Sequence, residues 1–140
     1  MKKLLNLMAF IAIALLVSNC GGNEAKTPAT LEKSFYTELQ KGNYEKAADL
    51  IIKNLSTDKE MTTEESAQLV KSFTEKAKQS TEAKGGVKSF EVVEEKISED
   101  GLSATVSTKV VYGNGTESTE QSKYVKKDNV WNCRWENNRN

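Results

Sequence analysis

Residues 102–116 read Leu-Ser-Ala-Thr-Val-Ser-Thr-Lys-Val-Val-Tyr-Gly-Asn-Gly-Thr, and this stretch decides the fold. From Leu102 to Tyr112 the even positions are apolar or threonine, while most odd positions are polar. This alternation is typical of a strand with one buried face and one solvated face. Gly113-Asn114-Gly115 follows at once and is a strong signal for a tight hairpin. We therefore expect an antiparallel strand pair on either side of this turn.

The same period of two residues continues on both sides of the hairpin. It predicts strands over residues 87–97, 102–112, 116–127 and 130–136, with turns at 98–101, 113–115 and 127–129. Alternation slips at Val92-Val93, where we expect a β-bulge that bends the sheet. Residues 116–123 are hydrophilic, which predicts an exposed strand whose charges guard an edge. Connections this short imply a four-stranded antiparallel meander.

Before residue 87 the apolar period lengthens to that of helices. Thr27-Pro28 predicts a capped helix start, Gly42-Asn43 a stop followed by a second cap, and Thr62-x-x-Glu65 a capping box that opens a third helix. The expected apolar stripes are Leu31, Phe35 and Leu39; Tyr44, Ala47, Ala48, Ile51 and Ile52; and Leu69, Val70, Phe73 and Ala77. Helices followed by a curved four-stranded antiparallel sheet define an α+β domain.

Composition excludes several classes of function. The chain has 140 residues, enough for one domain, and its 20 basic and 20 acidic residues cancel. Nucleic-acid binding needs a concentrated basic surface, so we expect no nucleic-acid partner. The sequence contains no histidine, which excludes Ser-His-Asp and Cys-His catalysis and histidine-containing zinc sites.

The first 19 residues have the organisation of an export signal. Lys2 and Lys3 precede an apolar run over residues 4–17, and Ser18-Asn19-Cys20 follows. A helix of that run would span about 21 Å, short of the ~30 Å hydrocarbon core that a permanent membrane helix must cross. We therefore expect residues 1–19 to be a cleaved signal peptide.

Cys20 indicates the kind of signal. Leu16-Val17-Ser18-Asn19-Cys20 resembles the lipobox of bacterial lipoproteins, although Asn19 departs from the usual small residue. This resemblance implies lipidation of Cys20 with acyl chains such as palmitate, and two or more such chains anchor a protein stably. The alternative is an ordinary signal in which the cysteine is incidental. Gly21, where an aspartate commonly retains lipoproteins at the inner membrane, favours the outer membrane of a Gram-negative cell envelope.

These features divide the chain into four parts. We expect a signal peptide over 1–19, a lipidated cysteine and flexible tether over 20–27, a single α+β domain over 28–136 and a polar tail over 137–140. Because lipidation consumes the sulfur of Cys20, Cys133 has no intramolecular partner. It alternates with Trp131 and Trp135, so we expect all three on one face and Cys133 as an inert core residue.

Several short motifs together resemble a known family. In order along the chain they are Phe35-Tyr36-x-x-Leu39-x-x-Gly42-Asn43-Tyr44-x-x-Ala47, Lys84-Gly85-Gly86-Val87, Ser98-Glu99-Asp100-Gly101, Val111-Tyr112-Gly113-Asn114-Gly115-Thr116 and Trp131. Over residues 28–135 the chain resembles small lipoproteins of the domain of unknown function 4878 family. That family is similar to the nuclear transport factor 2-like and lumazine-binding-like superfamily. The resemblance implies a cone in which a helical hairpin closes over a curved sheet and leaves a pocket at the open end.

We expect such a pocket to bind a small apolar ligand or to serve a protein interaction in the envelope. The aromatic residues available to line it are Tyr36, Phe90, Tyr112, Trp131 and Trp135. The alternative for each of them is that it simply fills the core. A large enclosed cavity lined by several of these rings would favour binding, whereas a solid interior would exclude it.

The competing hypothesis is an enzyme that uses carboxylates or tyrosines as acid and base. Asp49, Glu91 and Glu95 are the carboxylates to inspect, because they fall on amphipathic elements. Enzymes of the superfamily place an Asp–His pair or similar groups in the pocket, and a chain without histidine cannot carry that pair. We assign no catalytic residue, metal site or cofactor, and expect a non-catalytic role for a lipid-anchored protein.

Overall fold

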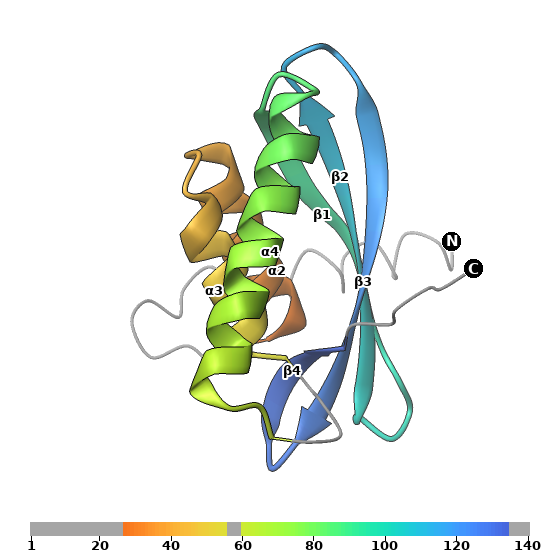
Figure 1. Ribbon diagram of the computed structural model, residues 1–140. Coiled ribbons are helices and arrows are strands. Elements are labelled where there is room, and N and C mark those ends of the chain that lie inside the picture. Colours follow the sequence, from red (N-terminus) through yellow and green to blue (C-terminus); the bar gives the residue numbers. More distant parts are fainter. Residues whose placement is uncertain (1–26, 56–59, 135–140) are drawn as a thin grey trace, which may run out of the picture.

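The computed structural model describes residues 27–55 and 60–134 (Figure 1). The predicted signal peptide, Cys20, Trp135 and the polar tail lie outside these residues. Among the residues that are described, none of the helices combines the length and apolar character needed to cross a membrane.

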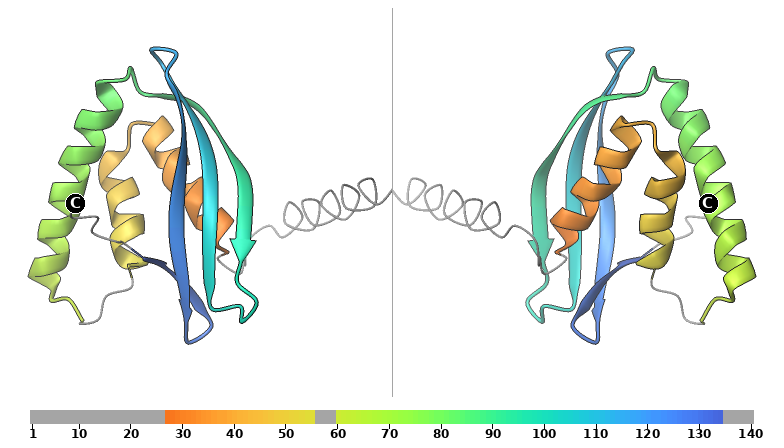
Figure 2. Two further views of the ribbon diagram at one scale, coloured as in Figure 1. Left: turned by 90° about the vertical axis from the view of Figure 1, so that its right-hand side faces the viewer. Right: turned by 90° about the vertical axis from the view of Figure 1, so that its left-hand side faces the viewer.

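Three helices precede four strands. The helices are α2 (Pro28–Gln40), α3 (Tyr44–Lys53) and α4 (Thr63–Glu82), and the strands are β1 (Val87–Ile97), β2 (Ser103–Tyr112), β3 (Glu117–Lys127) and β4 (Val130–Arg134). All neighbouring strands are antiparallel, in the order β1-β2-β3-β4. The helices lie on one side of the curved sheet (Figure 2). The predicted α+β architecture is confirmed.

Helix starts follow the predicted caps in two of three cases. The hydroxyl of Thr27 accepts a hydrogen bond from Thr30 N at 3.2 Å, and that of Thr62 accepts one from Glu65 N at 3.2 Å. Asn43 occupies the N-cap position of α3, but its side chain makes no capping bond. It donates to Glu38 Oε2 at 2.9 Å instead. The side-chain cap that we expected at Asn43 is therefore absent.

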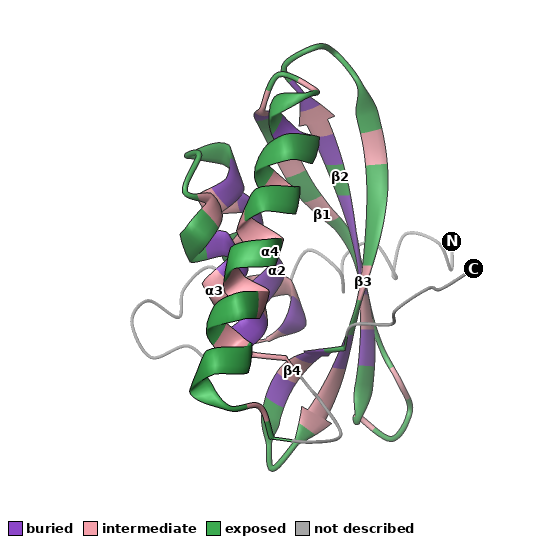
Figure 3. Ribbon diagram, in the orientation of Figure 1, coloured by how far each residue is buried: buried purple, intermediate pink, exposed green. Residues whose placement is uncertain are grey.

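Strand β2 forms the centre of the core, as its alternation predicts. Every second residue along it is buried, namely Ala104, Val106, Thr108, Val110 and Tyr112 (Figure 3). Ala104 and Val106 belong to one apolar cluster, and Val110 and Tyr112 belong to a second. Leu102 departs from this pattern and is 55% exposed, because β2 begins one residue later. The register of β1 slips between Val92 and Glu94, which confirms the predicted bulge, and slips once more between Val87 and Ser89.

Two glycine turns join the end of α4 to the end of the sheet. Gly113 N donates to Gly86 O at 2.8 Å, and Asn114 N donates to Lys84 O at 2.9 Å. Gly85 has a φ of +82°, and its backbone lies so close to Gly113 that a Cβ on Gly113 would overlap the Gly85 carbonyl. Only two residues without side chains permit this approach.

Helix α4 packs chiefly on α3 rather than on the sheet. Its apolar stripe of Leu69, Val70, Phe73 and Ala77 is half-buried, and Thr81 is its buried residue. Below it, the chain that follows α3 is tied to β4, because Cys133 N donates to Asn54 O. This arrangement leaves space between α4 and the strands β3 and β4.

Candidate functional site

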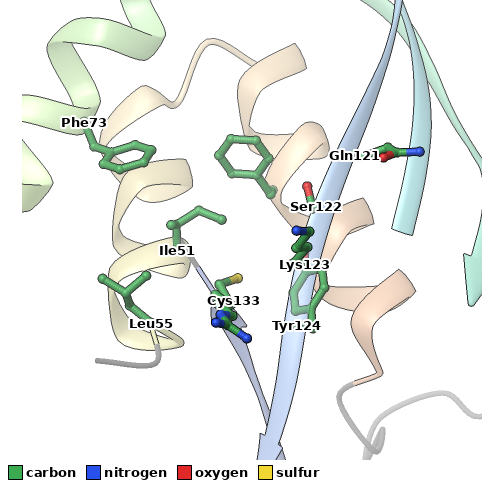
Figure 4. Close-up of a pocket in the computed structure, with 10 residues that line it drawn as sticks. Ile51, Leu55, Phe73, Gln121, Ser122, Lys123, Tyr124 and Cys133 are labelled. Atoms are coloured by element: carbon green, nitrogen blue, oxygen red, sulfur yellow. The ribbon is translucent and has the colours of Figure 1, made fainter. Parts of the chain in front are cut away.

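A cleft of about 550 Å³ lies between the helices and the C-terminal half of the sheet. Phe73, Ile51 and Leu55 line it on the helical side and face Ser122, Tyr124 and Cys133 on the sheet side (Figure 4). The remaining lining residues are Phe35, Gln121, Lys123 and Arg134. Each helix contributes apolar surface to the cleft, so its walls depend on how all three helices are placed.

A second hollow of about 730 Å³ adjoins the first. Phe35 and Phe73 line both, so the two hollows meet at these rings. Tyr36 and Tyr112 belong to the second hollow, together with Glu120 on β3. The molecule therefore has an aromatic cleft that extends along the inner side of the sheet.

The sheet side of the cleft is polar because of the register of β3. Glu120 pairs with Thr108 and Ser122 pairs with Val106. Thr108 and Val106 are buried on the side that carries the helices, so Glu120 and Ser122 point to that side as well. Within the described residues β4 pairs only with the last five residues of β3. The hydrophilic segment 117–122 thus has a free edge, as predicted, and it also supplies polar groups to the cleft.

A buried carboxyl group lies behind this polar wall. Glu32 is 2% exposed; Ser122 Oγ donates to its Oε1 at 2.8 Å, and the Tyr124 hydroxyl donates to its Oε2. Burial raises the pKa of Glu32, although the hydrogen bonds from Tyr124 and Ser122 lower it in part. The fully buried hydroxyl of Thr108 also lowers the pKa of Glu32, but within the described residues it forms no well-aligned hydrogen bond. The wall of the cleft therefore conceals a buried carboxyl group whose pKa is raised.

Sequence reasoning missed Glu32. The sequence contains one indication of its burial, since Glu32 lies four residues after Pro28 and four before Tyr36 and so shares a helix face with them. All three are buried in the structure. A charge in that row interrupts the apolar pattern beside Leu31. Pairing it with Tyr124 and Ser122, 92 and 90 residues further along the chain, required the structure.

The aromatic residues that we expected in the pocket occupy different places. Tyr36 and Tyr112 line the second hollow. Phe90 is half-buried and stacks on Tyr36, with ring centroids 5.6 Å apart. Trp131 belongs to the core and lies under Lys126 Nζ, 5.6 Å from it. Trp135 is outside the described residues.

The three carboxylates considered for acid–base chemistry do not meet. Asp49 pairs with Lys53 at 2.7 Å and lines a separate groove between α3 and α4. Glu95 accepts a hydrogen bond from Ala29 N at 2.9 Å and so caps the start of α2, while Glu91 is exposed on β1. None of the three lines the cleft or the hollow beside it.

Cys133 is buried, as we expected, and lines the cleft with its thiol. Burial raises the pKa of the Cys133 thiol to about 11, although the hydrogen bond with Tyr124 opposes this shift. A thiol with so high a pKa stays protonated near neutral pH and is a poor nucleophile. Across residues 27–55 and 60–134, no three histidine, cysteine or carboxylate side chains group in a way that could hold a metal ion.

Two solved structures from bacteria have a similar fold. An NTF2-like protein from Campylobacter jejuni, named as a candidate transpeptidase, superposes with a TM-score of 0.59 at 20% identity, covering 79% of this chain and 100% of that one. A SEC-C motif containing protein from Rhodopseudomonas palustris superposes with a TM-score of 0.51 at 18% identity, covering 81% of this chain and 79% of that one. At these identities the likeness concerns the fold.

The sequence itself matches a family model. Residues 18–134 match the family described as Domain of unknown function (DUF4878), whereas no curated protein matches the chain. The match covers most of the sequence, from just before Cys20 to the end of β4. The chain therefore belongs to the DUF4878 family, and its domain has the NTF2-like fold.

Proposed function

We propose that this chain is a lipid-anchored protein of the bacterial cell envelope whose cleft binds a small ligand with a largely apolar body, without transforming it. The supporting observation is the cleft wall itself. Phe35, Ile51 and Phe73 from the three helices, and Leu55 from the chain after α3, remain only half-buried although they face one space. Covering apolar side chains of this size is favourable by about 1.5–3 kcal/mol each when burial is complete.

The chemistry of the two walls limits the ligand. The helical wall is apolar, whereas the sheet wall offers the hydroxyl of Ser122 and, in the adjoining hollow, the carboxylate of Glu120. Lys123 and Arg134 add positive charge at the cleft. A ligand that matches this surface has an apolar face and one hydrogen-bonding or anionic edge.

Replacing Phe73 with serine is expected to weaken binding of the fluorescent probe anilinonaphthalene sulfonate about tenfold, because one apolar wall is lost. The probe has an aromatic body and a single anionic edge, as the cleft requires. Titration of fluorescence intensity at constant protein concentration measures the effect. Circular dichroism of the variant checks that the helices remain.

Val70→Ser is the matched control for Phe73→Ser. Val70 is on the same helix and is also half-buried, but it lines the separate groove between α3 and α4. Its replacement should leave probe affinity unchanged. Weakening by Val70→Ser alone would place the probe in the groove between α3 and α4, and an unaltered affinity of Phe73→Ser would exclude the cleft.

The anchor is supported by the sequence that precedes the domain. Lys2, Lys3, the apolar run over residues 4–17 and Cys20 have the order of a lipoprotein signal, and the family match begins at residue 18. Gly21 favours the outer membrane. We expect Cys20→Ala to move nearly all of the protein from the membrane fraction to the soluble fraction, with Cys133→Ala as the control that stays in membranes. A Cys20→Ala variant that still sediments with membranes contradicts the anchor.

A further inference from the structure

We infer that the end of the sheet formed by the β1–β2 and β3–β4 turns docks on the phospholipid surface to which Cys20 tethers the domain. This inference rests on the proposed anchor. It adds to it an orientation, a set of contacting residues and a partner, namely the bilayer itself. We call the surface the hairpin end and define it by Ile97, Leu102 and Val130.

The hairpin end gathers three of the four large apolar side chains that are exposed among the described residues. Ile97 is 51%, Leu102 55% and Val130 50% exposed. Ile97 and Leu102 flank the first turn, and Val130 follows the second. The two turns are adjacent, because Lys126 N donates to Leu102 O at 2.8 Å and Val130 pairs with Lys127. Both turns lie at the same end of the molecule (Figure 1).

The described chain also begins near this end. Ala29 N is 2.9 Å from Glu95 Oε2, which places the start of α2 beside the last residues of β1. Glu95 and Ile97 are two residues apart on this strand, about 7 Å. A lipidated Cys20 is therefore linked to the domain at a point close to Ile97 and Leu102.

The length of the tether excludes the opposite orientation. Thr27 is seven residues after Cys20, and this span reaches about 24 Å when fully extended. From Glu95 to the start of β1 at Val87 the strand is about 26 Å long, and the glycine turns lie beyond Val87. The tether is too short to run along β1 and let the opposite end, with the glycine turns at 84–86 and 113–115, rest on the bilayer.

The charges around the hairpin end indicate which force drives docking. Lys96, Lys126 and Lys127 are balanced by Glu99, Asp100 and Asp128. Asp100 is turned back on its own loop, since its carboxylate accepts from Leu102 N at 3.0 Å. With no excess of positive charge, attraction to anionic lipid is weak, so the apolar side chains supply the contact. Docking should therefore occur on zwitterionic phosphatidylcholine as well as on anionic membranes.

The experiment measures which end of the domain faces the lipid. The chain from Cys20 onward contains every described residue and is coupled through the Cys20 thiol to a maleimide lipid in phosphatidylcholine nanodiscs that carry a gadolinium-chelating lipid. Cys133 is buried and does not compete for the reagent. Amide signals of residues 98–101 and 128–129 are expected to lose at least about threefold more intensity than those of residues 84–86 and 113–115, because paramagnetic broadening reports nearness to the bilayer.

The double variant Ile97→Ser/Leu102→Ser separates docking from simple tethering. It should lose at least half of the contrast between the two ends, whereas Val93→Ser should keep it, since Val93 is the fourth exposed apolar residue and lies away from the turns. An unchanged contrast in the double variant means that the tether alone orients the domain and overturns the inference. So does a concentration-dependent dimer in lipid-free solution that buries the same residues. The chemical link replaces acylation by the cell, so failure of docking here stays distinct from failure of Cys20→Ala to release the protein.

Discussion

Replacing Tyr124 with alanine is expected to lower the free energy of unfolding by about 4 kcal/mol, the range found when large aromatic side chains are removed from cores. Tyr124 is 1% exposed and is the largest of the fully buried side chains. It packs with Leu31, Val106 and Trp131 in one core cluster. Its loss opens a void and also removes a donor from the buried Glu32. Urea denaturation followed by circular dichroism measures the change, and a loss below about 2 kcal/mol would contradict this account.

Tyr124→Phe is the control that keeps the ring and removes only the hydroxyl. We expect it to cost about 1–2 kcal/mol, because the carboxyl group of Glu32 is left buried without one of its hydrogen-bond donors. The cost should depend on pH through Glu32. Burial raises the pKa of Glu32 above 4.5 in the folded state, so its contribution to stability is present below pH 4.5 and is lost as the pH rises through the folded value.

The hydroxyl of Tyr124 lowers the pKa of Glu32 and so limits that loss. Without it the folded pKa of Glu32 rises further. The destabilisation caused by Tyr124→Phe is therefore expected to be larger at about pH 8 than at about pH 4. In a Glu32→Gln background this pH dependence should disappear. A larger destabilisation at about pH 4 than at about pH 8 would mean that the Tyr124 hydroxyl does not stabilise the ionised form of Glu32.

Replacing Gly113 with alanine is expected to destabilise the domain by about 3 kcal/mol, which corresponds to a fall in Tm of roughly 15 °C. The new methyl group would overlap the carbonyl of Gly85. Relief of that overlap requires the backbone to move and so breaks the hydrogen bonds of Gly113 N to Gly86 O and of Asn114 N to Lys84 O. Thermal unfolding measures the shift.

Gly115→Ala is the matched control in the same turn. Gly115 has a φ of +87° and open space around its Cα, so alanine there meets only the backbone preference, which costs about 1 kcal/mol. The difference between the two variants isolates the close approach of the two turns. Equal losses would show that the approach contributes nothing to stability.

The sequence predicted the sheet well because its signals are local. Alternation along β2, the hairpin motif at 113–115 and the slipped phase at Val92-Val93 each depend on neighbouring residues, and the structure confirms all three. Leu102 continues the alternation, yet it is exposed because it belongs to the turn. An alternating pattern identifies the buried face of a strand, but it does not show at which residue the strand and its pairing end.

The site was harder to predict because it depends on contacts between distant segments. The stripe of Leu69, Val70, Phe73 and Ala77 predicted a helix with one apolar face. It is half-buried because α4 rests on α3 and its inner residues border open space. Glu32 was missed for a related reason, since a pattern rule assigns a carboxylate to solvent unless its partners are known. The aromatic residues that we expected in the pocket were chosen by type alone, and Trp131 fills the core instead.

Hydrogen bonds between residues 84–86 and 113–114 join one end of α4 to the strands, while along its length the helix packs chiefly on α3. The width of the cleft then depends on the tilt of α4 about its hydrogen-bonded end. A change in α3 would therefore alter the width of the cleft through α4 and leave the strands unchanged.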